Sequence, residues 1–243
     1  MKLNFRIIKF IFIYTTMISS IFLYVDLKES PIVTNRISLI EEPVNKLEEK
    51  EDNSDVINKY IDKYNNKEVV GVISILNTSY EKAIMQHSDN DYYLDHLENK
   101  KKNFMGSIYL DFRNNISEDK KLLIYGHNSS NVKMPFDILE NYYNKDYYDE
   151  HRYIKILTKD STRIYKIFSV YIETNDFDYM QTDYDDDAVW VKHINKLKNN
   201  SMHEDDTILN EDDNILILQT CSTHKKYKNN KYKFLLVVAK EVK

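Results

Sequence analysis

The chain carries a single cysteine, Cys221, in a position suited to nucleophilic chemistry. It ends the apolar run from Ile215 to Leu218, after Gln219 and Thr220, and a polar segment follows. A thiol at the point where a strand meets a loop is held by a rigid scaffold and is open to substrate. The thiolate is the competent nucleophile, and a nearby cation is the usual means of lowering the pKa of a cysteine. A small buried hydrophobe is the alternative interpretation of a free cysteine.

A cysteine nucleophile needs a partner that moves protons, and the seven histidines supply the candidates. Five of them lie in polar segments or on expected helices, where a solvated imidazole is the default. His224 follows Cys221 closely, whereas His127 comes at the end of the apolar run from Lys121 to Gly126. Two strand ends that each deliver one reactive residue can form a Cys–His pair across neighbouring strands. The residues alone leave both His127 and His224 open.

Short β-type runs dominate the chain from residue 69 onward. Each has the length of a strand and is rich in β-branched or aromatic residues, which favour extended backbone. The predicted strands are 69–76, 107–112, 121–127, 153–158, 162–174, 214–221 and 233–242.

Three stretches, 48–64, 134–151 and 186–200, are predicted to be helical because their apolar residues recur at helical spacing. Their apolar positions are Val56, Ile57, Tyr60 and Ile61 in the first, Phe136, Leu139, Tyr143 and Tyr147 in the second, and Val189, Trp190, Ile194 and Leu197 in the third. Many strands with few helices favour a mainly β fold with helical additions (α+β). We expect a closed or nearly closed β-barrel with an N-terminal helix and a helix before the penultimate strand.

Residues 7–25 read IIKFIFIYTTMISSIFLYV and are apolar except for Lys9 and a few hydroxyls. At about 1.5 Å per residue, such a segment nearly crosses a hydrocarbon core of about 30 Å. Lys2, Arg6 and Lys9 lie at its start, and Asp26 and Glu29 follow it, which predicts a cytoplasmic start and an extracellular remainder. No cleavage site of the A-x-A kind follows, so an uncleaved signal-anchor is favoured over a cleaved signal peptide.

The predicted organisation is therefore a cytoplasmic tail at 1–6, a transmembrane signal-anchor at 7–25, a polar linker with the N-terminal helix at 26–66, and a folded domain at 67–243. This describes a single-pass protein of the cell membrane with its domain outside the cell. A net charge of −5 and the lack of a basic stripe among the aromatics argue against a nucleic-acid partner. One cysteine excludes an internal disulfide and any zinc site of the multi-cysteine kind.

Four ordered segments resemble one known family. YGHN (125–128), followed by MPFDILENYYNKDYYDEHRYI (134–154), resembles the histidine segment of the class B sortases. LQTCS (218–222) is similar to their Thr–x–Thr–Cys signature, although only the second Thr, Thr220, is kept and Leu218 precedes Gln219 where the first Thr would stand. DNDYYLDH (89–96) and GSIYLDFRN (106–114) resemble the segments upstream of that histidine. The resemblance runs from residue 69 to residue 242 in the family's order.

The resemblance implies a sortase catalytic domain at 67–243, with a β-barrel of about eight strands and with Cys221 and His127 as catalytic residues. It implies that Cys221 attacks the Thr carbonyl of a C-terminal sorting motif in a secreted protein while His127 protonates the leaving amine. The thioester would then be resolved by an amine of the peptidoglycan cross-bridge or of its lipid-linked precursor. No metal or organic cofactor is implied.

One family feature is missing. Sortases use an Arg after the cysteine, at the start of the last strand, to hold the substrate carbonyl or stabilise the oxyanion, and every Arg of this chain precedes Cys221. Counting back from Ala239 puts that Arg at Phe234, next to Lys233, which we predict to replace it. Strand alternation would point Lys233 to the wrong face unless a bulge shifts the register. A solvated surface lysine is the alternative, and Arg113 is expected to be structural.

Two other functions therefore stay open beside the transpeptidase. One is a degenerate sortase that binds sorting peptides with weak turnover, because lysine lacks the bidentate fork of arginine. The other is a surface cysteine peptidase that releases its product to water.

Overall fold

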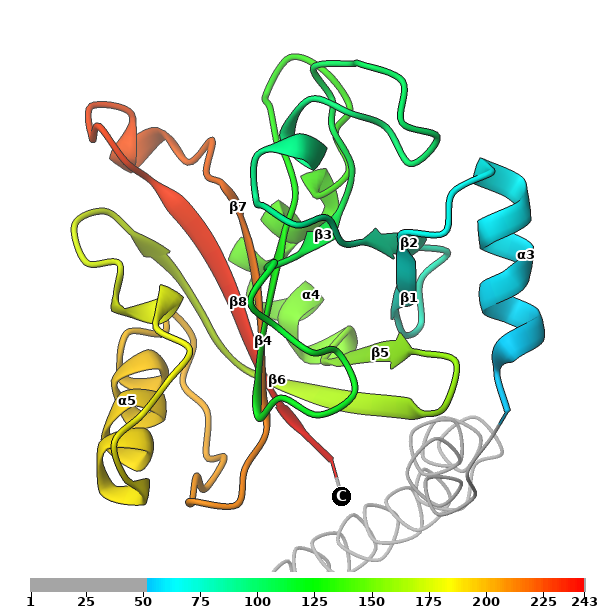
Figure 1. Cartoon of the computed structure of the whole chain (residues 1–243). Coiled ribbons are helices and arrows are strands. Elements are labelled where there is room, and N and C mark those ends of the chain that lie inside the picture. The colour runs from blue at the N-terminus through cyan, green and yellow to red at the C-terminus, as the bar shows by residue number, and fades with distance from the viewer. Residues whose placement is uncertain (1–51, 243) are drawn as a thin grey trace, which may run out of the picture. The chain divides into compact units, whose positions relative to one another are not determined.

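The structure, a computed structural model, describes residues 52–242. Within this range eight strands close a barrel in the order β1-β2-β3-β4-β7-β8-β6-β5 (Figure 1). The strands are β1 (Val69–Ile75), β2 (Glu81–Met85), β3 (Tyr109–Leu110), β4 (Lys121–Tyr125), β5 (Tyr153–Leu157), β6 (Thr162–Glu173), β7 (Ile215–Cys221) and β8 (Phe234–Glu241). The predicted fold class, a mainly β barrel with helical additions, is confirmed.

The pairing of β4 with β7 is parallel, although the two strands are far apart in the chain. Its register runs from Lys121↔Ile215 to Tyr125↔Gln219. Both strands are near-continuous apolar runs, as is typical of parallel strands covered on both faces. On its other edge β7 pairs antiparallel with β8. The carboxyl ends of β4 and β7 therefore lie side by side at one end of the barrel.

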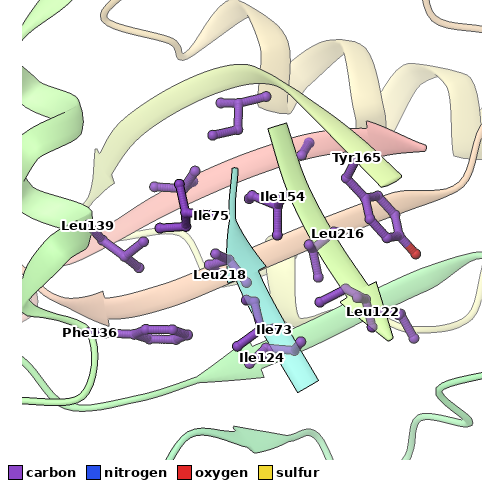
Figure 2. Close-up of a cluster of buried hydrophobic side chains, with 14 of the residues drawn as sticks. Ile73, Ile75, Leu122, Ile124, Phe136, Leu139, Ile154, Tyr165, Leu216 and Leu218 are labelled. Carbon is purple, nitrogen blue, oxygen red and sulfur yellow. The ribbon is translucent and has the colours of Figure 1, made fainter. Parts of the chain in front are cut away.

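The strand residues alternate between two buried layers. Inside the barrel, Ile73, Ile124 and Leu218 pack with Phe136, which comes from the long connection after β4 (Figure 2). Their strand neighbours point outward into a second layer that also holds Trp190. Burial of these side chains on both faces is the main favourable contribution to stability, at about 25 cal/mol for each Å² of apolar surface.

The described range also contains three α-helices: α3 (Ser54–Tyr64), α4 (Lys145–Glu150) and α5 (Asp187–Asn199). Helices α3 and α5 lie on opposite sides of the barrel (Figure 1). Short 3-10 helices are η1 (Tyr92–Leu94), η2 (Asp137–Tyr143), η3 (Asp178–Met180) and η4 (Lys225–Tyr227). Helix α5 confirms the prediction for 186–200, and it begins where the Asp186 side chain accepts from the Val189 N–H.

Several details of the predicted elements are wrong. The helix expected at 134–151 is instead two helices, η2 and α4, separated at Asn144. The Asn144 side chain accepts from the Asp146 and Tyr147 N–H groups and so caps the start of α4. Val56 and Val189, assigned to apolar stripes, are exposed, since they lie at the edges of the faces that pack. Strand β2 was not predicted at all.

The predicted signal-anchor at 7–25 and the tail at 1–6 lie outside the described residues, as does the linker up to residue 51. Among residues 52–242, no helix has the length and apolar character that crossing a membrane would require.

Candidate active site

Cys221 is the last residue of β7, and its side chain reaches solvent. The alternative of a small buried hydrophobe is therefore wrong. The preceding Thr220 is buried and points to the opposite face of the strand. Across the β7–β8 pair, Cys221 lies directly opposite Phe234.

The parallel register of β4 and β7 brings the ends of the two strands, which lead to His127 and Cys221, to the same edge of the barrel. From Tyr125↔Gln219, two more residues on each strand lead to His127 and Cys221. Polar contacts tie the two strand ends together at this point. The Gly126 N–H donates to Gln219 O at 3.2 Å, the Thr220 hydroxyl donates to Gly126 O at 2.7 Å, and the Asn128 amide donates to Cys221 O at 2.9 Å.

The ring of His127 is oriented by a backbone carbonyl from η1. Its Nε2 lies 2.8 Å from Leu94 O, and a carbonyl oxygen can only accept, so Nε2 carries a proton. The residue is half-buried. This contact fixes the tautomer of a neutral ring, with Nδ1 as the basic nitrogen.

His224 faces a different set of partners. Its ring lies 5.1 Å from that of Tyr143, edge to face, and its Nδ1 accepts from the Lys226 N–H. The turn that leads to it is held by the Tyr143–Ser222 hydroxyl contact at 2.7 Å. The contacts that join the two strand ends thus involve the residues around His127, while His224 packs on an aromatic ring.

Two opposing effects act on the thiol of Cys221. Burial by the surrounding protein raises its pKa above the ordinary value, and the positive charge of Lys233 lowers it. Lys233 directly precedes β8 and is half-buried, and its carbonyl accepts from the Ser222 N–H at 2.8 Å. The β7–β8 register runs without a shift from Ile215↔Lys240 to Cys221↔Phe234, so the bulge considered for Lys233 is not present in this pairing.

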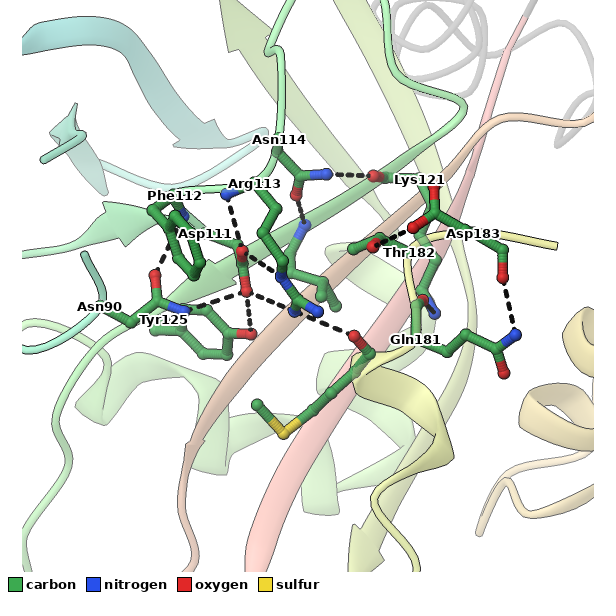
Figure 3. Close-up of polar contacts among 12 residues, drawn as sticks. Asn90, Asp111, Phe112, Arg113, Asn114, Lys121, Tyr125, Gln181, Thr182 and Asp183 are labelled. Carbon is green, nitrogen blue, oxygen red and sulfur yellow. Dashed lines mark hydrogen bonds and ion pairs between the residues drawn. The ribbon is translucent and has the colours of Figure 1, made fainter. Parts of the chain in front are cut away.

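A polar network that the sequence did not reveal supports the strand before His127. The side chain of Asp111 is fully buried and accepts from the Tyr125 hydroxyl at 2.8 Å and from Asn90 at 3.1 Å (Figure 3). Arg113 donates to the same carboxylate through Nε and Nη2, both at 2.8 Å. Burial alone would raise the pKa of Asp111, but these hydrogen bonds hold it below the usual value. Asp111 therefore stays ionised and orients Tyr125, two residues before His127.

Arg113 and Lys121 also reach the segment between β6 and α5. Arg113 Nη2 donates to Met180 O at 2.9 Å. Lys121 Nζ donates to Gln181 O at 2.8 Å and to the Tyr184 hydroxyl at 2.7 Å, and it lies 3.0 Å from His193 Nε2. The structural role expected for Arg113 fits these contacts.

A cavity of about 570 Å³ lies behind this segment and is lined by Arg113, Lys121, Trp190 and a group of aspartates, without Cys221 or His127. Among the residues from 52 to 242, no group of three His, Cys, Asp or Glu side chains is arranged to hold a metal ion.

Comparison with known proteins agrees with this geometry. The family model for the sortase domain matches residues 73–242. Sortase B of Listeria monocytogenes is 34% identical over 167 residues, which cover 68% of each chain. The solved Staphylococcus aureus sortase B–substrate complex has a TM-score of 0.69 and 26% identity, covering 90% of this chain and 98% of its own. A structure of sortase B complexed with triglycine has a TM-score of 0.68 and 29% identity, covering 76% and 85%. The chain therefore belongs to the sortase family and is a class B sortase, a cysteine transpeptidase.

Proposed function

We propose that this sortase uses Cys221 and His127 to cut a C-terminal sorting motif in a secreted protein and to join the protein to a peptidoglycan amine. The observation that carries the proposal is the parallel pairing of β4 with β7, whose last pair, Tyr125↔Gln219, stands two residues before His127 on one strand and Cys221 on the other. The contacts from Thr220 and Asn128 that tie the strand ends together support it. A rigid pair of strand ends suits a reaction that needs its two groups within about 3 Å of the same reacting centre.

The state of the thiol determines the order of proton transfers. Because burial raises the pKa of Cys221, the thiol enters the reaction protonated at neutral pH. His127 takes this proton at Nδ1 as Sγ attacks the carbonyl carbon of the sorting-motif Thr. The leaving amine then takes the proton from His127 as the C–N bond breaks. The products are a thioester on Cys221 and a released C-terminal peptide.

The second half-reaction regenerates the enzyme. The acceptor nitrogen attacks the thioester carbonyl and gives its proton to His127, and the sulfur of Cys221 leaves with the electrons of the C–S bond. The solved complex of sortase B with triglycine supports an amine of the oligoglycine kind as the acceptor. Water in the same position would give hydrolysis instead.

The unshifted β7–β8 register puts Lys233 one position away from Phe234, the residue opposite Cys221, and so speaks against a role for Lys233 at the oxyanion. Lys233 is nevertheless our candidate for stabilising the oxyanion, because its charge favours the thiolate at Cys221. Loss of one well-placed donor typically costs about 2.7–4 kcal/mol in the transition state, so Lys233→Ala should lower kcat/KM by about 10²-fold or more. Lys233→Arg should retain or raise activity. Lys231→Ala is the matched control, since it has the same charge two residues away. If kcat/KM of Lys233→Ala stays within a few-fold of the parent value, Lys233 is only a charged surface residue.

One observation favours the second candidate function, a degenerate sortase with weak turnover. The residue directly opposite Cys221 is Phe234, which cannot donate to an oxyanion. If Lys233 does not replace the missing donor, the tetrahedral intermediate forms slowly although peptides still bind.

The deciding experiment is mass spectrometry of the full chain incubated with a library of pentapeptides that contain Thr, with and without triglycine. We expect an acyl adduct on Cys221 and, with triglycine, a product joined to it by an amide bond. Hydrolysed product alone would indicate a cysteine peptidase, and bound peptide without product would indicate the degenerate sortase. Cys221→Ala should form no adduct, and an adduct on this variant would overturn the assignment of the nucleophile.

Sortases are proteins of the cell surface. For this chain we propose a single-pass membrane protein with the signal-anchor at 7–25 and the catalytic domain at 67–243 outside the cell, supported by the apolar run and the basic residues before it. Alkaline carbonate extraction should leave the full chain in the membrane pellet. Its release into the supernatant would contradict the anchor.

A further inference from the structure

The ring of His127 is held by two parts of the chain that are not neighbours in the sequence. Its backbone continues β4, and its Nε2 donates to Leu94 O, at the end of η1, at 2.8 Å. Leu94 precedes His127 by 33 positions. Whether this contact forms therefore depends on how η1 is placed against the end of β4.

One buried carboxylate connects these two parts. Asp111 follows β3, and its side chain accepts from the Tyr125 hydroxyl at 2.8 Å and from the Asn90 amide at 3.1 Å (Figure 3). Tyr125 is the last residue of β4, and Asn90 precedes the first residue of η1 by two positions. The Asn90 side chain is itself fixed, since its carbonyl oxygen accepts from the Phe112 N–H at 3.0 Å. A shift of either part against the other would break a contact to Asp111.

Stability alone does not account for this buried charge. The Asp111 side chain is fully buried, and Arg113 donates to both of its oxygens at 2.8 Å. Replacing a buried ion pair by apolar side chains of similar volume is often neutral or stabilising, because both charges have lost their hydration. What a buried and fully hydrogen-bonded pair provides instead is one defined arrangement of the groups around it. Here those groups are the end of β4 and the turn before η1.

We propose that Asp111 is a positioning residue for His127. Its carboxylate holds η1 against the end of β4, so that the Leu94 carbonyl keeps the His127 proton on Nε2 and leaves Nδ1 free to accept a proton. Without the contact to Leu94, the neutral ring could also carry its proton on Nδ1, where it cannot accept another. Asp111 does not contact the reacting atoms and acts through η1 and β4. This inference rests on the proposed role of His127 as the group that takes the proton of Cys221.

Loss of the Asp111 contacts should shift η1 rather than unfold it. The Ser107 N–H donates to Tyr93 O at 3.0 Å, and the Ser107 hydroxyl donates to His96 O at 2.8 Å. Neither contact involves Asp111, so both remain in its variants. A displacement of about 1 Å between catalytic groups can lower a rate by about 10²-fold. We therefore expect large losses of rate in proteins that are still folded.

The test measures kcat and KM of the full chain with triglycine as acceptor and with the pentapeptide that acylates Cys221 in the library above. Asp111→Asn should lower kcat by about 10–10²-fold and leave KM within about twofold, because His127 acts in the chemical steps. Tyr125→Phe and Asn90→Ala each remove one of the two connections to Asp111 and should lower kcat by about tenfold. These two variants carry the test if Asp111→Asn does not fold.

Glu241→Gln is the matched control. Glu241 accepts from Arg163 through Nε and Nη2 at 3.0 and 2.9 Å and from the Asn214 amide at 2.7 Å, so its donors are of the same kinds. It lies at the opposite end of β7 from Cys221, because Asn214 directly precedes that strand. Its loss should lower Tm but keep kcat per folded molecule. If Asp111→Asn keeps the parent kcat per folded molecule, or if Glu241→Gln loses as much, the proposal is overturned.

A second readout does not depend on transpeptidation. Long-range proton–nitrogen NMR spectra of the chain labelled with ¹⁵N-histidine distinguish the two neutral tautomers, and the spectrum of His127→Ala identifies the signals of His127. At about pH 8, where an ordinary imidazole is neutral, the parent should carry this proton on Nε2, and Asp111→Asn should show both tautomers. If no peptide acylates the parent but this difference is present, the proposed function fails and the positioning role stands. If peptides acylate Cys221 and the variants keep the parent kcat and tautomer, the positioning role fails and the function stands.

Discussion

Replacing Gly126 with Ala should damage both stability and catalysis, because this glycine joins the strand end that carries His127 to the barrel core. A Cβ built at Gly126 would lie 2.7 Å from Cδ2 and 3.0 Å from Cγ of Phe136. The Phe136 ring is fully buried inside the barrel, and its own N–H donates to His127 O at 3.0 Å. The ring cannot move aside without moving its neighbours or the histidine.

The expected size of both losses follows from the overlap between the new Cβ and the Phe136 ring. Overpacking a well-filled core typically costs about 1–3 kcal/mol in the free energy of unfolding, or about 2–4 °C in Tm for each kcal/mol in a chain of this size. A displacement of His127 by about 1 Å would lower kcat/KM by up to about 10²-fold. Urea denaturation measures the first effect, and the peptide assay on the folded fraction measures the second.

A double-mutant cycle with Phe136→Leu tests the mechanism, since the smaller side chain makes room for the new methyl group. Residues in direct contact typically couple by about 0.5–3 kcal/mol, so Gly126→Ala/Phe136→Leu should be more stable than the sum of the single changes predicts. Gly71→Ala is the matched control. Its Cβ would meet Ile116 Cδ1 at 2.9 Å and Leu157 O at 3.0 Å, on a strand that is three positions away from β4 in the barrel. It should lose stability but keep its activity per folded molecule. Additive free energies, or a fully active Gly126→Ala enzyme, would refute the reasoning.

Three further predictions concern protons. His127→Ala should lower transpeptidation by about 10²–10⁴-fold, and His224→Ala far less, as measured by kcat/KM with a cleaved peptide; the reverse order would make His224 the partner of the thiol. Lys233→Ala should shift the pH profile of Cys221 alkylation by iodoacetamide to higher pH, because the lysine charge lowers the thiol pKa; an unchanged profile would contradict this. Burial, together with the charge of Arg113, lowers the pKa of Lys121 to about 7, while the unfolded chain keeps this proton up to a pH of about 10.4. Since the unfolded state then binds more protons, the free energy of unfolding should rise by about 1 kcal/mol between pH 7.5 and 8.5. Urea denaturation should detect this gain in the parent protein but not in Lys121→Met.

The strands of the barrel could be predicted closely because burial and apolar pattern coincide in them. The run predicted at 214–221 is β7, Ile215–Cys221, and the run at 162–174 is β6, Thr162–Glu173. Strand β2 was missed for the opposite reason. Its first two residues, Glu81 and Lys82, are exposed, and its extended form depends on pairing with β1. Local composition carries little information on a strand that its neighbour defines.

The surroundings of the thiol were harder to predict than the thiol itself. Cys221 and His127 stand out because each ends an apolar run. The contact from Arg113 to Met180 spans 67 positions, and the packing of Phe177 on Phe234 joins two segments with no shared local pattern. Spacing along one element cannot show which loop will lie against it. The packing of Phe177 on Phe234 and the Asp111 network therefore became visible only in the folded chain.

The face on which the two reactive residues lie follows from core packing. Along β4 and β7, Leu122, Ile124, Leu216 and Leu218 pack inside the barrel, and the residues between them pack outside. Cys221 and His127 continue the outward series on their strands, and the Cys221 side chain reaches solvent there. A slip of one residue in either strand would turn its reactive residue toward the interior and exchange the inner and outer sets of side chains. The many buried apolar side chains on both faces oppose such a slip, so the geometry of the pair is stabilised by residues that never contact substrate.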